Sequence, residues 1–272
     1  MNRVPILLPA LLLGLAGPPL FAAPPAPAAP SGAAALSVEA EQRAALAELD
    51  RVSAAGKLQS AEGKALRTGE AAEWIGPDLE GGLAPDKLIQ ISPERAVART
   101  PAGKVPQDTY TYLEKVDGRW TVSAERTLAL SFLLREYKED LESKPATTPD
   151  QQALLRNVRL TVASDAELAA WFARHGAELD AIKNDYVAAG SSDWVIAKGE
   201  GKSGPLIDRL RALGVAGIGR SEPGFVEVII GGVLENAVGF LFDGGKPPPR
   251  PSPDDYIWIE PLGSGWYLFR TS

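Results

Sequence analysis

The chain has 272 residues, of which 45% are hydrophobic and 23% are charged, proportions that are ordinary for a globular protein and exclude disorder over the whole length. Its formal net charge of −7 gives no general attraction for nucleic acid or an anionic bilayer, so we expect neither as a partner. The absence of cysteine excludes disulfides, thiolate metal sites and a cysteine nucleophile.

Residues 1–23 have the features of a secretory signal peptide of the bacterial type. Arg3 supplies a positive charge, a leucine-rich apolar stretch follows, and Ala22 and Ala23 are small residues at which a signal peptidase could cut. The alternative is an uncleaved membrane anchor, which needs about 20 consecutive apolar residues in one helix. Prolines interrupt this stretch and disfavour such a helix. We therefore expect a periplasmic or secreted protein with no integral membrane span after signal cleavage.

An alanine- and proline-rich segment follows at 24–36. Such a composition buries little apolar surface and favours extended, semi-rigid conformations, so it predicts a spacer. Two α+β regions are expected after it, at 37–143 and 148–272, with a connector between them.

The first region is expected to begin with helices and to continue with a small sheet. Ser37 is a candidate N-cap for an amphipathic helix that ends before Gly56, and a weaker helical stretch lies at 58–66. The Asp117-Gly118 pair predicts a β-hairpin, because both positions tolerate positive φ. The expected strands lie at 87–91, 110–116 and 119–122, and a further helix is expected at 124–141.

Two capping signals predict helices in the second region. Thr148 with Gln151 three residues later forms one, with proline at the first helical position. Ser164 with Glu167 forms the other, and it precedes the longest amphipathic helix, which is expected to run from 165 to near Gly190.

The last third changes to strand periodicity. A strand is expected at 193–197 and a helix at 205–213, ended by Gly214. The strands expected next lie at 225–234, 237–242, 256–260 and 266–270. They predict an antiparallel four-stranded meander packed on a helix, and the loop at 244–254 holds five prolines. The predicted fold class is therefore α+β.

Neither a phosphate-binding loop nor a histidine site is well supported. Gly201-Lys202-Ser203 matches the end of a phosphate-binding loop, but Ile196 stands where the motif needs its first glycine, so no cofactor is expected. His175 is the only histidine, and it is in step with the apolar side of the 165–190 helix. We interpret it as structural or surface-exposed, and no metal site is expected.

Acidic pairs leave a hydrolase possible as an alternative function. Asp254-Asp255, Glu139-Asp140 and Glu235 near Asp243 are such pairs, and two carboxylates about 5–10 Å apart suffice for glycoside hydrolysis. Sequence spacing does not give that distance, and most acidic residues lie on surfaces. Neither Gly-x-Ser-x-Gly nor Ser-x-x-Lys occurs in the chain.

Aromatic residues of the C-terminal strands are the candidate partner-binding residues: Tyr256, Trp258, Trp266 and Tyr267. Tyr256 and Trp258 are expected on one strand face, because side chains two residues apart share a face. These aromatics either form a recognition surface or fill the core between sheet and helix. We favour a non-enzymatic protein that binds another envelope or secreted protein, or a glycan, through its C-terminal sheet, with an extracytoplasmic hydrolase as the alternative.

Overall fold

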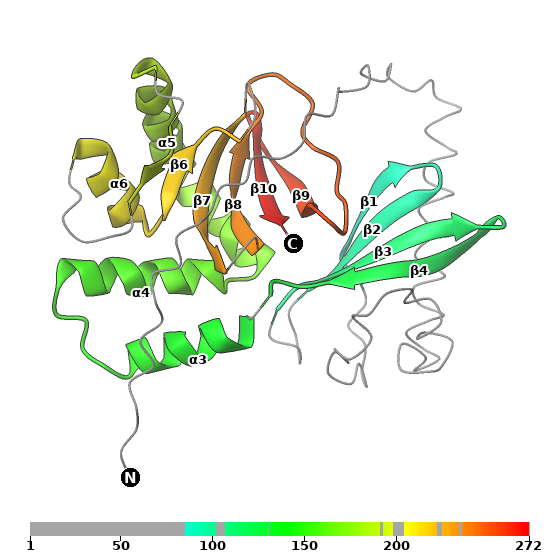
Figure 1. Cartoon of the computed structure of the whole chain (residues 1–272), viewed down its shortest axis with the longest axis horizontal. Helices are drawn as coiled ribbons and strands as arrows, with labels where there is room; N and C mark the ends of the chain where they lie inside the picture. Colours follow the sequence, from blue (N-terminus) through cyan, green and yellow to red (C-terminus); the bar gives the residue numbers. More distant parts are fainter. Residues whose placement is uncertain are drawn as a thin grey trace, which may run out of the picture.

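The computed structural model describes residues 85–101, 107–129, 131–190, 193–197, 204–221, 225–233 and 236–271. The expected signal peptide, spacer and helices at 37–55 and 58–66 lie outside these ranges. The described chain forms two antiparallel sheets and four helices, so the α+β class is confirmed (Figure 1).

The first sheet has four strands in sequential order: β1 (Lys87–Ser92), β2 (Arg95–Thr100), β3 (Thr109–Val116) and β4 (Arg119–Arg126). Asp117 and Gly118 connect β3 and β4 with φ values of 51° and 77°, the signs that a tight hairpin turn requires. Strand β2 was absent from the sequence prediction. The expected helix at 124–141 is wrong at its start, because Ala124 to Arg126 pair with β3 and the helix begins only at Ser131.

The four helices are α3 (Ser131–Glu142), α4 (Pro149–Thr161), α5 (Asp165–Ala188) and α6 (Pro205–Leu213). Both predicted capping boxes are confirmed, since Thr148 and Ser164 each accept a hydrogen bond from the backbone three residues on. Gly214 ends α6 with φ 77°, as expected of a C-terminal glycine. None of the helices in the described ranges has both the length and the apolar character needed to cross a membrane.

The second sheet contains six strands: β5 (Val195–Ile196), β6 (Gly217–Gly219), β7 (Val226–Val233), β8 (Asn236–Phe242), β9 (Tyr256–Gly263) and β10 (Trp266–Thr271). Their order is β5-β6-β7-β8-β10-β9, so the predicted four-stranded meander is wrong. The last strand, β10, lies between β8 and β9 and pairs with both. The proline-rich loop between β8 and β9 is long enough to carry the chain past one strand position, about 5 Å wide.

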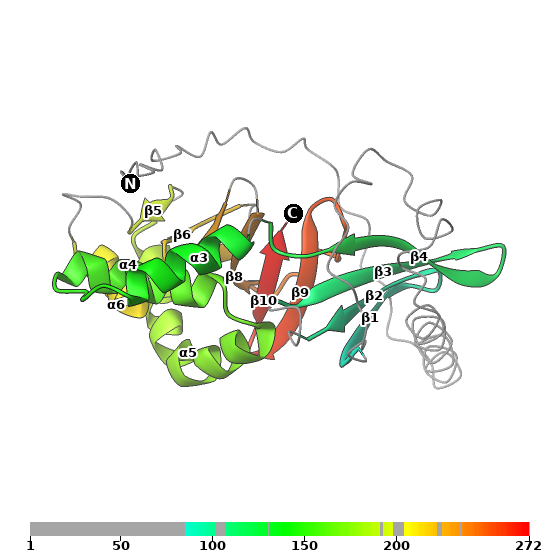
Figure 2. The ribbon, with the colours of Figure 1, turned by 90° about the horizontal axis from the view of Figure 1, so that it is seen from below.

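The main core lies between this sheet and the helices α4, α5 and α6 (Figure 2). Inward-facing residues such as Val228, Phe240 and Leu268 meet Leu168, Leu179 and other apolar residues of the helices. Close approach of α4 requires Gly231, because a Cβ there would collide with the Thr161 hydroxyl. The four-stranded sheet packs against β9 at the edge of the larger sheet through a second cluster: Val97, Tyr110, Tyr112, Ile257 and Trp258.

Candidate functional site

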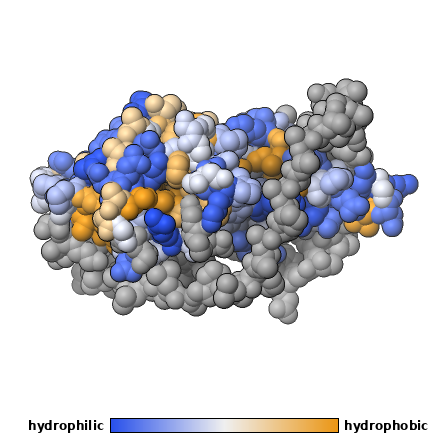
Figure 3. Space-filling view, turned by 90° about the horizontal axis from the view of Figure 1, so that it is seen from above, coloured by the Kyte–Doolittle hydropathy of each residue, from blue (hydrophilic) through white to orange (hydrophobic). Residues whose placement is uncertain are grey.

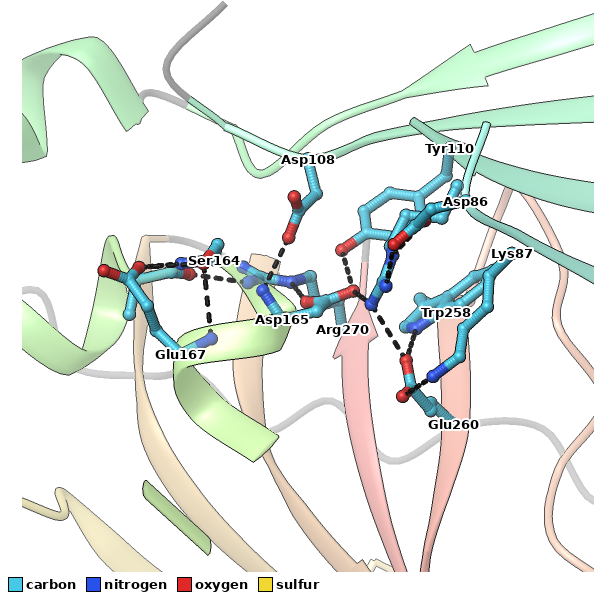
Figure 4. Close-up of polar contacts among 12 residues, drawn as sticks. Asp86, Lys87, Asp108, Tyr110, Ser164, Asp165, Glu167, Trp258, Glu260 and Arg270 are labelled. Atoms are coloured by element: carbon cyan, nitrogen blue, oxygen red, sulfur yellow. Dashed lines mark hydrogen bonds and ion pairs between the residues drawn. The ribbon is translucent and has the colours of Figure 1, made fainter. Parts of the chain in front are cut away.

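Charged side chains, five of them buried, meet where the two sheets and the start of α5 come together (Figure 4). We call this group the polar junction; its members are Asp86, Lys87, Arg99, Asp108, Tyr110, Asp165, Trp258, Glu260 and Arg270. These residues come from both sheets, from the start of α5 and from the two segments that precede β1 and β3. The strands that contribute are β1, β2, β3, β9 and β10. No single stretch of sequence contains the site.

Asp165 is at the centre of the polar junction and is fully buried. Because Ser164 caps α5, the helix begins at Asp165 and this carboxylate lies at the helix N-terminus, where negative charge is favoured. One carboxylate oxygen accepts a hydrogen bond from Arg270 Nε at 2.7 Å, and the other from the Tyr110 hydroxyl at 2.8 Å. The Asp165 backbone N–H donates to Asp108 at 2.6 Å.

Arg99 connects carboxylates from three parts of the chain. Its guanidinium donates two hydrogen bonds to Asp86, at 2.9 and 2.5 Å, and one to Glu260 at 3.0 Å. It also forms an ion pair with Asp165 at 3.4 Å. Glu260 receives further hydrogen bonds from Lys87 and from Trp258 Nε1. Burial lowers the pKa of Arg99, but these carboxylates outweigh it and raise the pKa above its ordinary value.

The polar junction is suited to holding the sheets together rather than to acid–base catalysis. A general acid needs a carboxyl that can reach a substrate proton. Here Asp165 and Glu260 are buried, and both are engaged by cations and neutral donors. A substrate would have to displace those donors. Among the residues the structure describes, no group of three His, Asp or Glu side chains is placed to hold a metal ion.

Acid should destabilise the polar junction, because it protonates the Asp86 carboxylate. Hydrogen bonds from Arg99 are the main cause of the lowered pKa of Asp86, which lies below the ordinary 3.8. Because folding lowers this pKa, the carboxylate stabilises the fold above about pH 4, and the contribution is lost as the pH falls through the lowered value. We expect Asp86→Asn to reduce the free energy of unfolding at pH 6 and to have a smaller effect at pH 2.5. Urea unfolding at both pH values measures this; a difference that is equal or larger at pH 2.5 contradicts it.

Both tryptophans proposed for partner binding lie in the interior. Trp258 is fully buried and packs on Tyr110 with ring centroids 5.2 Å apart. Trp266 is 2% exposed, contacts Phe172 and donates its ring N–H to Asp180 at 3.1 Å. Neither side chain can contact a partner in this fold, so core packing is the interpretation that fits these two residues.

Tyr256 and Tyr267 lie on the other face of the sheet, half-buried beside Phe269. The expectation that Tyr256 and Trp258 share a strand face is wrong. Between them Ile257 has no partner on β10, because Trp258 pairs with Arg270 and Tyr256 with the next residue, Thr271. This β-bulge turns Tyr256 to the opposite face, where its hydroxyl donates to Glu227 at 2.6 Å. The four candidate residues therefore do not form one surface.

The remaining candidates have structural surroundings. His175 is half-buried on α5 and packs on Trp171, with ring centroids 4.6 Å apart. Lys144 pairs with Asp140 at 2.5 Å and Arg126 with Asp254 at 3.6 Å, both as surface ion pairs. Gly201-Lys202-Ser203 and Glu235 lie outside the described residues.

Exposed apolar side chains gather instead on α3. Phe132, Leu133 and Tyr137 are 48%, 47% and 36% exposed. We call these three residues the α3 face. In Figure 1 this helix lies below α4, and in Figure 2, seen from below, it lies beside α4. The other strongly exposed large apolar residues in the described ranges, Val116 and Val187, lie on other elements, at the end of β3 and near the end of α5. Figure 3 views the molecule from above, and there hydrophobic areas lie mainly over the half that holds the six-stranded sheet, with a small spot at the right-hand end.

The α3 face has a signal in the sequence beyond the predicted helix itself. The segment carries two apolar stripes at helical spacing, Leu134 with Leu141, and Leu133 with Tyr137. Only one stripe can pack on α4. Leu134 and Leu141 are the half-buried pair, and so the second stripe faces outward.

Comparisons with protein-family models, with curated proteins and with solved structures found no match to this chain.

Proposed function

We propose that the protein is an exported, non-enzymatic binding protein that contacts a partner protein through the α3 face. The observation that carries this proposal is the exposure of Phe132, Leu133 and Tyr137 within two turns of one helix. Grouped apolar side chains on a surface are characteristic of interaction sites, whereas single ones are ordinary. Export rests on the signal-peptide features of residues 1–23.

The α3 face replaces the C-terminal sheet as the proposed binding surface. Trp258 and Trp266 are core residues, and the Tyr256 hydroxyl is already bonded to Glu227. A protein partner is proposed for the α3 face because apolar side chains of a partner can cover Phe132 and Leu133 and remove them from water. The hydrolase alternative finds no support in the polar junction, whose central carboxylates are already engaged.

Partner capture should depend on Leu133. The mature protein is used as bait to capture the partner from the envelope fraction of the cells that make it. We expect Leu133→Ser to weaken this capture by about thirtyfold relative to the wild type, because a lost binding hot spot costs about 2 kcal/mol. The bound partner is quantified by mass spectrometry across a bait dilution series. The midpoint of thermal unfolding should remain close to that of the wild type, because Leu133 is half exposed.

Val116→Ser is the matched control, since Val116 is 51% exposed but lies on the hairpin of the first sheet, away from α3 (Figure 1). It should leave capture unchanged. Equal capture by wild type and Leu133→Ser, with both folded, contradicts the proposed function.

A further inference from the structure

We infer that the partner segment bound by the α3 face is itself amphipathic and cationic, with basic residues beside apolar ones. This inference rests on the proposed function and adds the chemistry of the partner. It is carried by the carboxylates that lie among the three apolar residues of the α3 face.

Acidic side chains interrupt and border the α3 face. Glu136 follows Phe132 by four residues and Asp140 follows Glu136 by four, so all three lie along one side of the helix. Leu133 and Tyr137 lie along the adjacent row. Glu136 and Asp140 are both exposed, as is Glu139 beside them. A partner that covers Phe132 and Leu133 must therefore lie within reach of these carboxylates.

The basic residues of α3 do not neutralise this surface. Arg135 is half-buried and faces Asp108 and Glu167, whose charges oppose the effect of burial on its pKa. Lys138 lies close enough to Glu142 to lower the pKa of that carboxyl, although the hydrogen bond from Arg159 lowers this pKa more.

Beyond the end of α3, Lys144 pairs with Asp140. It therefore balances one of the three exposed carboxylates. Negative charge remains at Glu136 and Glu139.

A second copy of this chain is a poor occupant. In a symmetric dimer the same patch meets itself, so the acidic side chains of the α3 region in one copy would lie near those of the other copy. Like charges in contact oppose association. An anionic bilayer is repelled for the same reason. A helix or extended segment with lysine or arginine beside leucine-type residues satisfies both the apolar and the acidic parts of the surface.

Three synthetic 18-residue peptides test this inference with the full mature protein: a leucine–lysine amphipathic helix, a leucine–glutamate helix of the same pattern, and a serine–lysine peptide. Fluorescence anisotropy gives each Kd. We expect the leucine–lysine peptide to bind at least tenfold more tightly than either of the others. Leu133→Ser should weaken that binding at least tenfold, and so should Glu136→Lys.

Glu178→Lys is the matched charge control, because Glu178 is an exposed acidic residue on α5 and its substitution changes the net charge by the same amount. It should change the Kd less than twofold. Equal weakening by Glu136→Lys and Glu178→Lys means that net charge alone attracts the peptide, and it overturns the inference. Equal binding of the leucine–glutamate peptide overturns the cationic partner but leaves the proposed function standing. No effect of Leu133→Ser on any peptide or on partner capture removes the proposed function itself.

Discussion

Asp165→Asn should destabilise the protein by about 3–5 kcal/mol, the usual cost of removing one charge from a buried ion pair. Asparagine keeps the shape of the side chain but not its charge. Arg270, which is also buried and donates to Asp165 at 2.7 Å, would then lack its closest counter-charge. Since domains are typically stable by about 5–15 kcal/mol, this change removes a large share of the total.

Urea unfolding at pH 7, followed by tryptophan fluorescence, measures the effect. Asp140→Asn is the control, because its ion pair with Lys144 is exposed and should contribute less than about 1 kcal/mol. A loss for Asp165→Asn no greater than that of Asp140→Asn would show that the polar junction does not stabilise the fold.

The second large effect is expected for Trp258→Ala, at about 3–5 kcal/mol. The side chain is fully buried between the two sheets, packs on Tyr110 and donates to Glu260 at 3.1 Å. Alanine leaves a cavity at the contact between the sheets and removes one donor from Glu260. The free energy of unfolding measures the loss, and partner affinity measured on the folded fraction should stay unchanged.

Val116→Ala is the corresponding exposed substitution and should change stability by less than about 0.5 kcal/mol. If Trp258→Ala instead abolished partner binding with the melting temperature preserved, Trp258 would belong to the binding surface and its placement in the core would be wrong.

Features determined by neighbouring residues could be predicted from the sequence. The caps at Thr148 and Ser164 and the glycine that ends α6 follow from local hydrogen bonding and from the φ values that particular residues allow. Strand β2 was missed because its sequence, Arg-Ala-Val-Ala-Arg-Thr, has few of the β-branched and aromatic residues that mark strands. Pairing with strands on both sides stabilises it instead.

The polar junction could not be predicted, because its contacts join residues far apart in the chain. Arg99 is 66 residues from Asp165 and 161 residues from Glu260. The strand order could not be predicted for the same reason, because the alternation of side chains along β10 does not tell which strands pair with it. The bulge at Ile257 is a third case; one unpaired residue moved Tyr256 away from the face of Trp258.

Site-specific photo-crosslinking can detect a partner that contacts α3. A benzophenone amino acid replaces Tyr137 in one variant and Val116 in another, and both are irradiated in cells that make the protein. We expect a covalent adduct with one partner protein from position 137 and none from position 116. Adducts from neither position, or equal adducts from both, would contradict it.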